Sequence, residues 1–177
     1  LNFTDKEYWY IQTSPFFGYG ESYKNSNLRD EVEYQRVSNL LYAEYRNNLL
    51  GEIAFQVKHS NYNYGYQRKL ILDSATINNR IKGDLVSVGG RYHKKIGGFD
   101  LTGDAMINLS EEFSGNYLKA KARYRINEDA VADAALVINS SAPNFNFLLF
   151  QSDYVNYNWQ NDFDNIQKQD LSVNLKS

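Results

Sequence analysis

The sequence predicts an all-β protein, an antiparallel up-and-down transmembrane β-barrel of which these 177 residues form a segment. Three observations lead to this prediction. Apolar and polar residues alternate along most of the chain, as in strands that have one apolar and one polar face. Short and longer connections follow one another between the alternating runs, as in up-and-down membrane barrels. Tyr occurs 15 times, and several aromatic residues lie close to the short connections.

The alternation predicts about nine strands. They span residues 8–22, 31–45, 49–64, 81–95, 99–110, 117–126, 130–140, 149–159 and 167–176. The stretch 116–139 contains the two clearest runs. In the first, four cations occupy every second position and small apolar residues lie between them. The second run repeats the alternation with Ala, Leu and Ile on one face. These two runs therefore predict a hairpin with an apolar and a charged face.

The connections between the predicted strands fall into two classes. The short ones are 46–48, 97–98, 127–129 and 160–165, and they occupy every second connection. The longer ones include 65–80 and 141–148, although 111–115 is short. We therefore expect tight turns at one end of the sheet and longer loops at the other.

The turns also predict which residues face one another across strands. A two-residue hairpin loop at 97–98 pairs residues of opposite charge on one face. The predicted pairs are Lys95 with Asp100, His93 with Thr102, and Arg91 with Asp104. A three-residue loop at 127–129 pairs Arg123 with Asp133, and the connection before Gly115 brings Asp104 near Lys121 and Asp100 near Arg125.

These pairs predict a charged face that lines the lumen of the barrel. Its candidate residues are Arg91, Asp100, Asp104, Lys119, Lys121, Arg123, Arg125 and Asp133. Rings of fixed charge in a wet lumen bias which solutes pass. The alternative is structural, since ions that line a narrow barrel can neutralise one another and conduct nothing.

The opposite face carries almost no charge, and alternation alone does not separate a membrane barrel from a soluble one. Aromatic placement favours the membrane. Four aromatic residues of the apolar face lie within a few residues of a short turn, and they predict an interfacial girdle. They are Tyr45, Tyr92, Tyr124 and Trp159.

Composition excludes several other classes. A net charge of -2 and a pI near 5.7 give no basic surface for nucleic acid. His59 and His93 have no ligand spacing, and residues 162–165 are best explained as a polar turn, so we expect no metal and no cofactor. No nucleophile or phosphate-binding motif is present, so we expect no enzyme. The sequence also contains no apolar run long enough for a transmembrane helix. Its first residues lack the basic and apolar regions of a signal peptide.

Two stretches carry a family resemblance: "NFNFLLFQSDYVNYNWQNDFDNIQKQDLSVNLKS" at 144–177 and "SPFFGYGESYKN" at 14–25. Both are rich in Tyr and Asn, and the chain resembles the putative porin family of Bacteroidota. The resemblance implies an outer-membrane barrel of a Gram-negative bacterium, in contact with outer-membrane lipids and small solutes. It transfers no set of functional residues.

The sequence predicts a single barrel over 1–177 with no second domain. It ends in mid-alternation and the predicted strand number is odd, whereas bacterial barrels close with an even number, so we expect a segment of a longer barrel. Three functions follow as hypotheses. They are a passive diffusion channel for small solutes, a non-conducting barrel that is structural or binds an envelope-complex partner, and a soluble β-sheet module that binds glycans.

Overall fold

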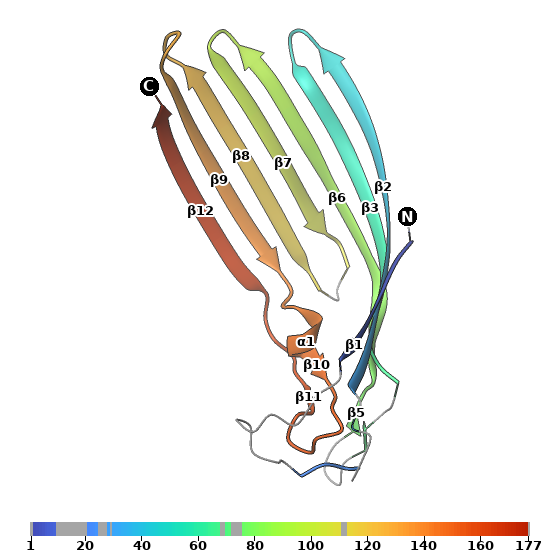
Figure 1. Cartoon of the computed structure of the whole chain (residues 1–177). Coiled ribbons are helices and arrows are strands. Elements are labelled where there is room, and N and C mark those ends of the chain that lie inside the picture. Colours follow the sequence, from blue (N-terminus) through green and yellow to red (C-terminus); the bar gives the residue numbers. More distant parts are fainter. Residues whose placement is uncertain are drawn as a thin grey trace. The chain divides into compact units, whose positions relative to one another are not determined.

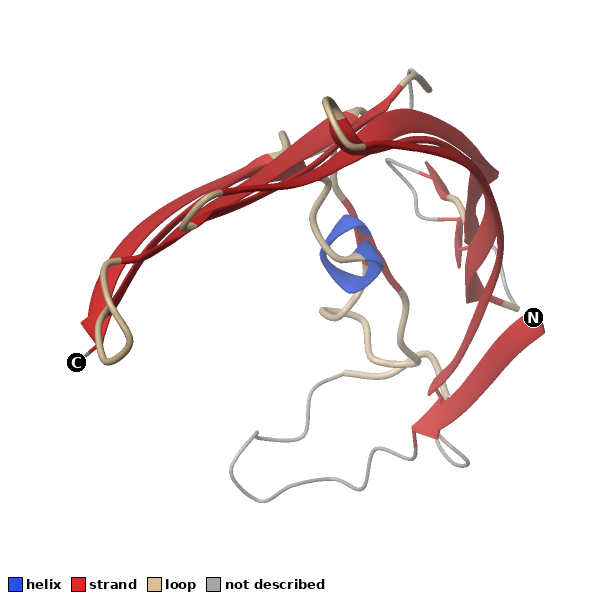
Figure 2. Ribbon diagram, turned by 90° about the horizontal axis from the view of Figure 1, so that it is seen from above, coloured by secondary structure: helices blue, strands red, loops and turns tan. Residues whose placement is uncertain are grey.

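The computed structural model describes residues 2–9, 21–24, 28, 30–67, 70–71, 76–110 and 113–176. Within these ranges α1 (Phe145–Leu148) is the only helix, and strands make up most of the remainder (Figure 2). No helix in the described part of the chain is long and apolar enough to cross a membrane.

Eight strands form the main sheet, in the order β1-β2-β3-β6-β7-β8-β9-β12 (Figure 1). Their bounds are β1 Asn2–Trp9, β2 Asp30–Asn47, β3 Gly51–Tyr66, β6 Arg80–Ile96, β7 Phe99–Asn108, β8 Gly115–Arg125, β9 Val131–Ser141 and β12 Ile166–Lys176. Two small hairpins lie outside this sheet: β4 (Leu70–Ile71) with β5 (Thr76–Ile77), and β10 (Leu149–Phe150) with β11 (Trp159–Gln160). Apart from these hairpins, each strand neighbours the strand that precedes it in the chain. The predicted all-β, antiparallel, up-and-down architecture is confirmed.

Seven of the predicted strands correspond to β2, β3, β6, β7, β8, β9 and β12. The strand predicted at 8–22 falls largely on residues 10–20, which lie outside the described residues, and β1 ends at Trp9. The strand predicted at 149–159 is wrong. Side-chain hydrogen bonds hold this stretch in a folded loop: Asn158 Oδ1 accepts from the Ser152 backbone N–H at 2.9 Å, and Asn158 Nδ2 donates to the Tyr154 carbonyl at 2.6 Å.

Asparagine side chains shape two of the tight turns. Asn47 Oδ1 accepts backbone N–H bonds from Leu49 at 2.7 Å and Leu50 at 3.3 Å. Asn127 Oδ1 does the same for Asp129 at 3.0 Å and Ala130 at 2.7 Å. Such local bonds replace ladder partners that the backbone loses where a strand ends.

Two turn glycines have positive φ angles but very different surroundings. Gly51 has φ +91°, and a Cβ there would lie 2.6 Å from the His93 carbonyl oxygen, whereas at Gly97, with φ +57°, a Cβ would meet nothing within 4 Å. We expect Gly51→Ala to lower the free energy of unfolding by about 1–3 kcal/mol, more than Gly97→Ala does, because only Gly51 adds a clash to the backbone strain. Urea midpoints of the full-length protein in detergent micelles measure both, and equal losses would contradict the role of crowding at Gly51.

The chain divides into two compact units. Unit 1 consists of Leu1–Ser38, Ser60–Asp84 and Pro143–Asp164, and unit 2 of Asn39–His59, Leu85–Ala142 and Asn165–Ser177.

Unit 1 contains an aromatic core. Tyr64, Tyr66, Ile77 and Leu149 are buried together in it. The ring of Phe145, in α1, stacks on Tyr64 with centroids 5.3 Å apart, and the segment that carries α1, β10 and β11 therefore packs on the end of β3. Offset and tilted ring pairs of this kind add to the free energy of burial.

Unit 2 has no comparable core. Its strands form one layer, and within the described residues its buried side chains are those of Ala54, Gln56 and Ser140. Ile107 lies in β7, which has a strand on either side, yet it is 49% exposed. The apolar side chains on the face of Ile107 are consequently not covered by a second layer of described residues within unit 2.

Candidate functional site

The charges predicted to line a lumen lie on four consecutive strands of unit 2, β6, β7, β8 and β9, and alternation places them on one face. The residues predicted to line a lumen all lie on this face. They are Arg91 on β6, Asp100 and Asp104 on β7, Lys119, Lys121, Arg123 and Arg125 on β8, and Asp133 on β9.

The predicted register between β6 and β7 is confirmed. Lys95 faces Asp100, His93 faces Thr102 and Arg91 faces Asp104. Two of these pairs are ion pairs: Arg91 Nε lies 3.4 Å from Asp104 Oδ2, and Lys95 Nζ lies 3.6 Å from Asp100 Oδ2. The turn at 97–98 therefore determines which charges meet.

The predicted register between β7 and β8 is wrong by two residues. Asp104 faces Lys119 instead of Lys121, and Asp100 faces Arg123 instead of Arg125. The ladder closes at the pair Asn108 and Gly115, so β7 ends two residues before the predicted 110 and β8 begins two residues before the predicted 117. Asn108 bonds within the connection, donating from Nδ2 to the Phe113 carbonyl at 2.6 Å and accepting at Oδ1 from the Ser110 N–H at 3.1 Å. A shift of two residues leaves every side chain on its expected face.

The predicted register between β8 and β9 is confirmed, since Arg123 faces Asp133. The carboxylate nevertheless forms its ion pair with a diagonal neighbour. Lys121 Nζ lies 3.6 Å from Asp133 Oδ1. Long side chains on a strand can reach such diagonal partners as readily as the residue directly opposite.

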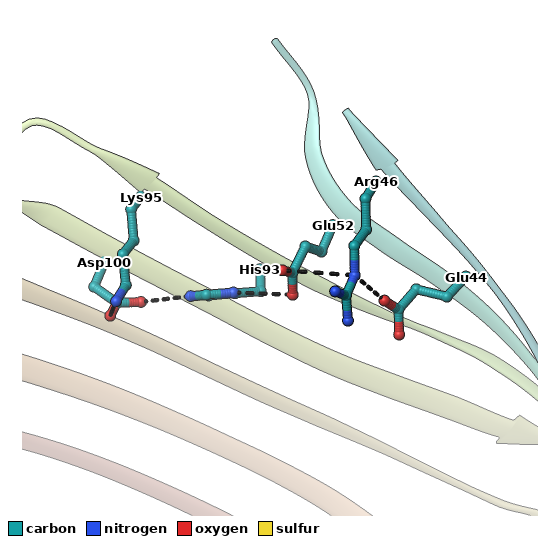
Figure 3. A network of polar contacts seen from close by, with 6 residues as sticks. All are labelled: Glu44, Arg46, Glu52, His93, Lys95 and Asp100. Carbon is teal, nitrogen blue, oxygen red and sulfur yellow. Dashed lines mark hydrogen bonds and ion pairs between the residues drawn. The ribbon is translucent and has the colours of Figure 1, made fainter. Parts of the chain in front are cut away.

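A chain of polar contacts crosses from β2 to β7 on this face (Figure 3). Arg46 contacts Glu44 and lies 3.8 Å from Glu52, and Glu52 Oε2 lies 3.2 Å from His93 Nδ1. His93 Nε2 lies 3.0 Å from Asp100 Oδ1. The imidazole thus lies between two carboxylates, and it donates to both at once only when it carries a proton on each nitrogen.

Three members of this network were absent from the sequence prediction: Glu44, Arg46 and Glu52. A signal for them existed. Tyr45 was predicted on the apolar face, so its neighbours Glu44 and Arg46 belong to the charged face by alternation. Tyr117 was also missed, although its hydroxyl donates to Asp104 Oδ1 at 2.8 Å. No His, Cys, Asp and Glu side chains in the described ranges are grouped to hold a metal ion.

The apolar face of unit 2 carries three of the four predicted girdle residues. Tyr45, Tyr92 and Tyr124 are all exposed, and the ring of Tyr124 stacks on Phe99 with centroids 4.3 Å apart. Trp159 differs, because the long strand that was expected to carry it does not form. It lies in β11 of unit 1, where its ring stacks on Phe150 at 4.6 Å and its Nε1 donates to the Asn146 carbonyl at 3.0 Å.

Unit 1 contains a polar cluster that the sequence reading also missed. Asp30 accepts from Ser152 Oγ and from the Asp153 N–H, each at 2.8 Å. The side chain of Asp153 is 1% exposed and pairs with Lys24 at 2.8 Å. Charge-assisted bonds of this kind are the strong ones, and they anchor the loop after β10 to the start of β2.

Comparison with known proteins gives one match. No curated protein and no solved structure is similar to the chain at a significant level. The family described as "Putative porin" matches residues 1–177. A one-layer, up-and-down sheet with one charged and one exposed apolar face has the pattern of strands in outer-membrane barrels. The chain belongs to this porin family.

Proposed function

We propose that the chain is part of an outer-membrane β-barrel through which small solutes diffuse passively. The observation that supports this most strongly is the division of unit 2 into two faces on the same strands. One face carries ionic groups, and the other exposes large apolar side chains such as those of Ile53, Phe55, Ile107 and Leu118.

The apolar face argues for lipid as its environment. Exposed apolar area costs about 25 cal/mol per Å² in water, and contiguous patches of this kind mark contacts with membranes or partners. Leu171 in β12 is 75% exposed, although its neighbour across the strands is Leu136, so pairing within the sheet does not cover it. Hydrocarbon would cover this face without a second protein layer.

The charged face argues for water on the other side. Ionic side chains are stable in a wet lumen, and fixed charge there biases the passage of ions. Membership of a porin family supports the outer membrane of a Gram-negative bacterium as the location. The partners in this proposal are outer-membrane lipids and small solutes.

A non-conducting barrel is the second candidate, and the ion pairs favour it. Two ion pairs neutralise charge across neighbouring strands, as in a purely structural lining: Arg91 with Asp104, and Lys121 with Asp133. A soluble glycan-binding module is less well supported, because it leaves the apolar face of unit 2 uncovered.

Planar bilayers test the proposal. The full-length protein, inserted into phosphatidylcholine bilayers in potassium chloride, is expected to give discrete steps of conductance. Heat-modifiable migration on gels provides the control for folding, and a heat-denatured sample provides the blank. Protein that is folded and inserted but gives no steps would support the non-conducting barrel, and protein that stays soluble without detergent would support the glycan-binding module.

A further inference from the structure

Most cations of the β8 stripe lack a carboxylate partner among the described residues. The stripe consists of Lys119, Lys121, Arg123 and Arg125. Lys121 pairs with Asp133, whereas Lys119, Arg123 and Arg125 form no ion pair with any residue that the structure describes. This stripe was expected to be compensated by Asp100 and Asp104.

Those two carboxylates are engaged by other groups. Asp104 pairs with Arg91 at 3.4 Å and accepts from the Tyr117 hydroxyl at 2.8 Å. Asp100 contacts His93 at 3.0 Å and Lys95 at 3.6 Å. The cations of β6 therefore take the acidic groups that face β8.

The strand on the other side of β8 offers little compensation. Lys119 faces Val137 and Arg125 faces Val131, so neither has an acidic residue directly opposite it on β9. Over the charged face of β6 from Leu85 onward, and of β7, β8 and β9, six Lys and Arg residues stand against three Asp residues. This surplus of three positive charges lies along β8.

Like charges at alternate strand positions are only about 7 Å apart, so a row of them is unfavourable until anions bind. Two of the unpaired groups are guanidinium ions. Arginine presents a planar fork of N–H donors that matches carboxylate and phosphate oxygens, and lysine adds a mobile positive charge. The stripe thus combines excess charge with donors shaped for oxyanions.

We propose that Lys119, Arg123 and Arg125 form an oxyanion track, a binding site for small solutes that carry a carboxylate or phosphate group. The proposal rests on the proposed function in one respect, because the track guides transport only if the charged face lines a conducting lumen. Binding itself requires only that this face meets water.

Titration calorimetry tests the track directly. The full-length protein in dodecyl maltoside, which has no phosphate headgroup, is titrated with inorganic phosphate and, separately, with succinate. We expect wild type to bind both, and the triple variant Lys119→Gln, Arg123→Gln, Arg125→Gln to bind at least about tenfold more weakly, the equivalent of one lost charge-assisted contact. Lys94→Gln, which removes a cation from the apolar face of β6, is the matched control and is expected to bind as wild type does.

A second variant protects the test if the triple variant does not fold. Arg123→Lys with Arg125→Lys keeps the charge and removes the fork, so we expect weaker phosphate binding than in wild type but the same reversal potential as wild type in bilayers under a salt gradient. Wild type that binds neither probe, or a folded triple variant that binds as tightly as wild type, overturns the track. Binding without conductance overturns the channel and supports the track. Conductance without binding overturns the track and supports the channel.

Discussion

Replacing Leu149 by Ala is expected to lower the free energy of local unfolding in unit 1 by about 2–5 kcal/mol. Leu149 is 0% exposed and lies against Tyr64, Tyr66 and Ile77. Shortening its isobutyl side chain to a methyl group leaves a cavity, because the surrounding rings belong to hydrogen-bonded strands and loops and can move only partly. The Tyr64 hydroxyl, for example, donates to the Leu149 carbonyl at 3.3 Å.

Limited proteolysis measures this effect, since cleavage follows the population of the open state. We expect the segment from Pro143 to Asp164 to be cleaved much faster in Leu149→Ala than in wild type. Leu171→Ala is the matched control, because it makes the same substitution in a strand at a side chain that is 75% exposed. Similar cleavage rates in the two variants would mean that Leu149 does not hold the segment in place.

Replacing Leu136 by Arg is expected to lower the free energy of unfolding in lipid by about 2–4 kcal/mol, the cost of a cation near the middle of the hydrocarbon layer. Leu136 lies in the middle of β9, on the apolar face, between Ala120 of β8 and Leu171 of β12. Within β8, β9 and β12, that face carries no Asp or Glu to compensate the guanidinium.

Ile126→Arg is the control for depth. Ile126 follows β8 at a tight turn and is 51% exposed. There a guanidinium can reach headgroups and water, so we expect a cost of about 0–1 kcal/mol. Urea titrations in phosphatidylcholine vesicles compare the two variants. Equal costs at the two depths would argue against contact between this face and lipid.

Alternation along the sequence sufficed for the long strands and their faces. Because side chains on a strand point alternately to its two sides, Lys119, Lys121 and Arg123 had to share one face of their strand whatever the loops did. The turn at Gly97 and Gly98 was informative for the same kind of reason. A two-residue hairpin loop allows only one register between its two strands, and the pairing of Lys95 with Asp100 follows from that register.

Registers across a longer connection were beyond such reasoning. The number of residues between β7 and β8 does not say how many of them extend the ladder. Here the ladder ends at Asn108 opposite Gly115, where Asn108 donates to the Phe113 carbonyl, and Lys119 therefore lies opposite Asp104. The sequence also did not predict which ion pairs form, because Asp100 and Asp104 have cations within reach on both β6 and β8.

By itself, the sequence determined the all-β class, the order of the long strands, and the charged and apolar faces, because these depend on residues near one another in the chain. Only the tertiary structure decided the fate of residues 149–159. Their alternation resembles that of a strand, yet Leu149 packs among Tyr64, Tyr66 and Ile77, and Asp30 holds Ser152 and Asp153. These contacts join residues more than 70 positions apart, so no local pattern announces them.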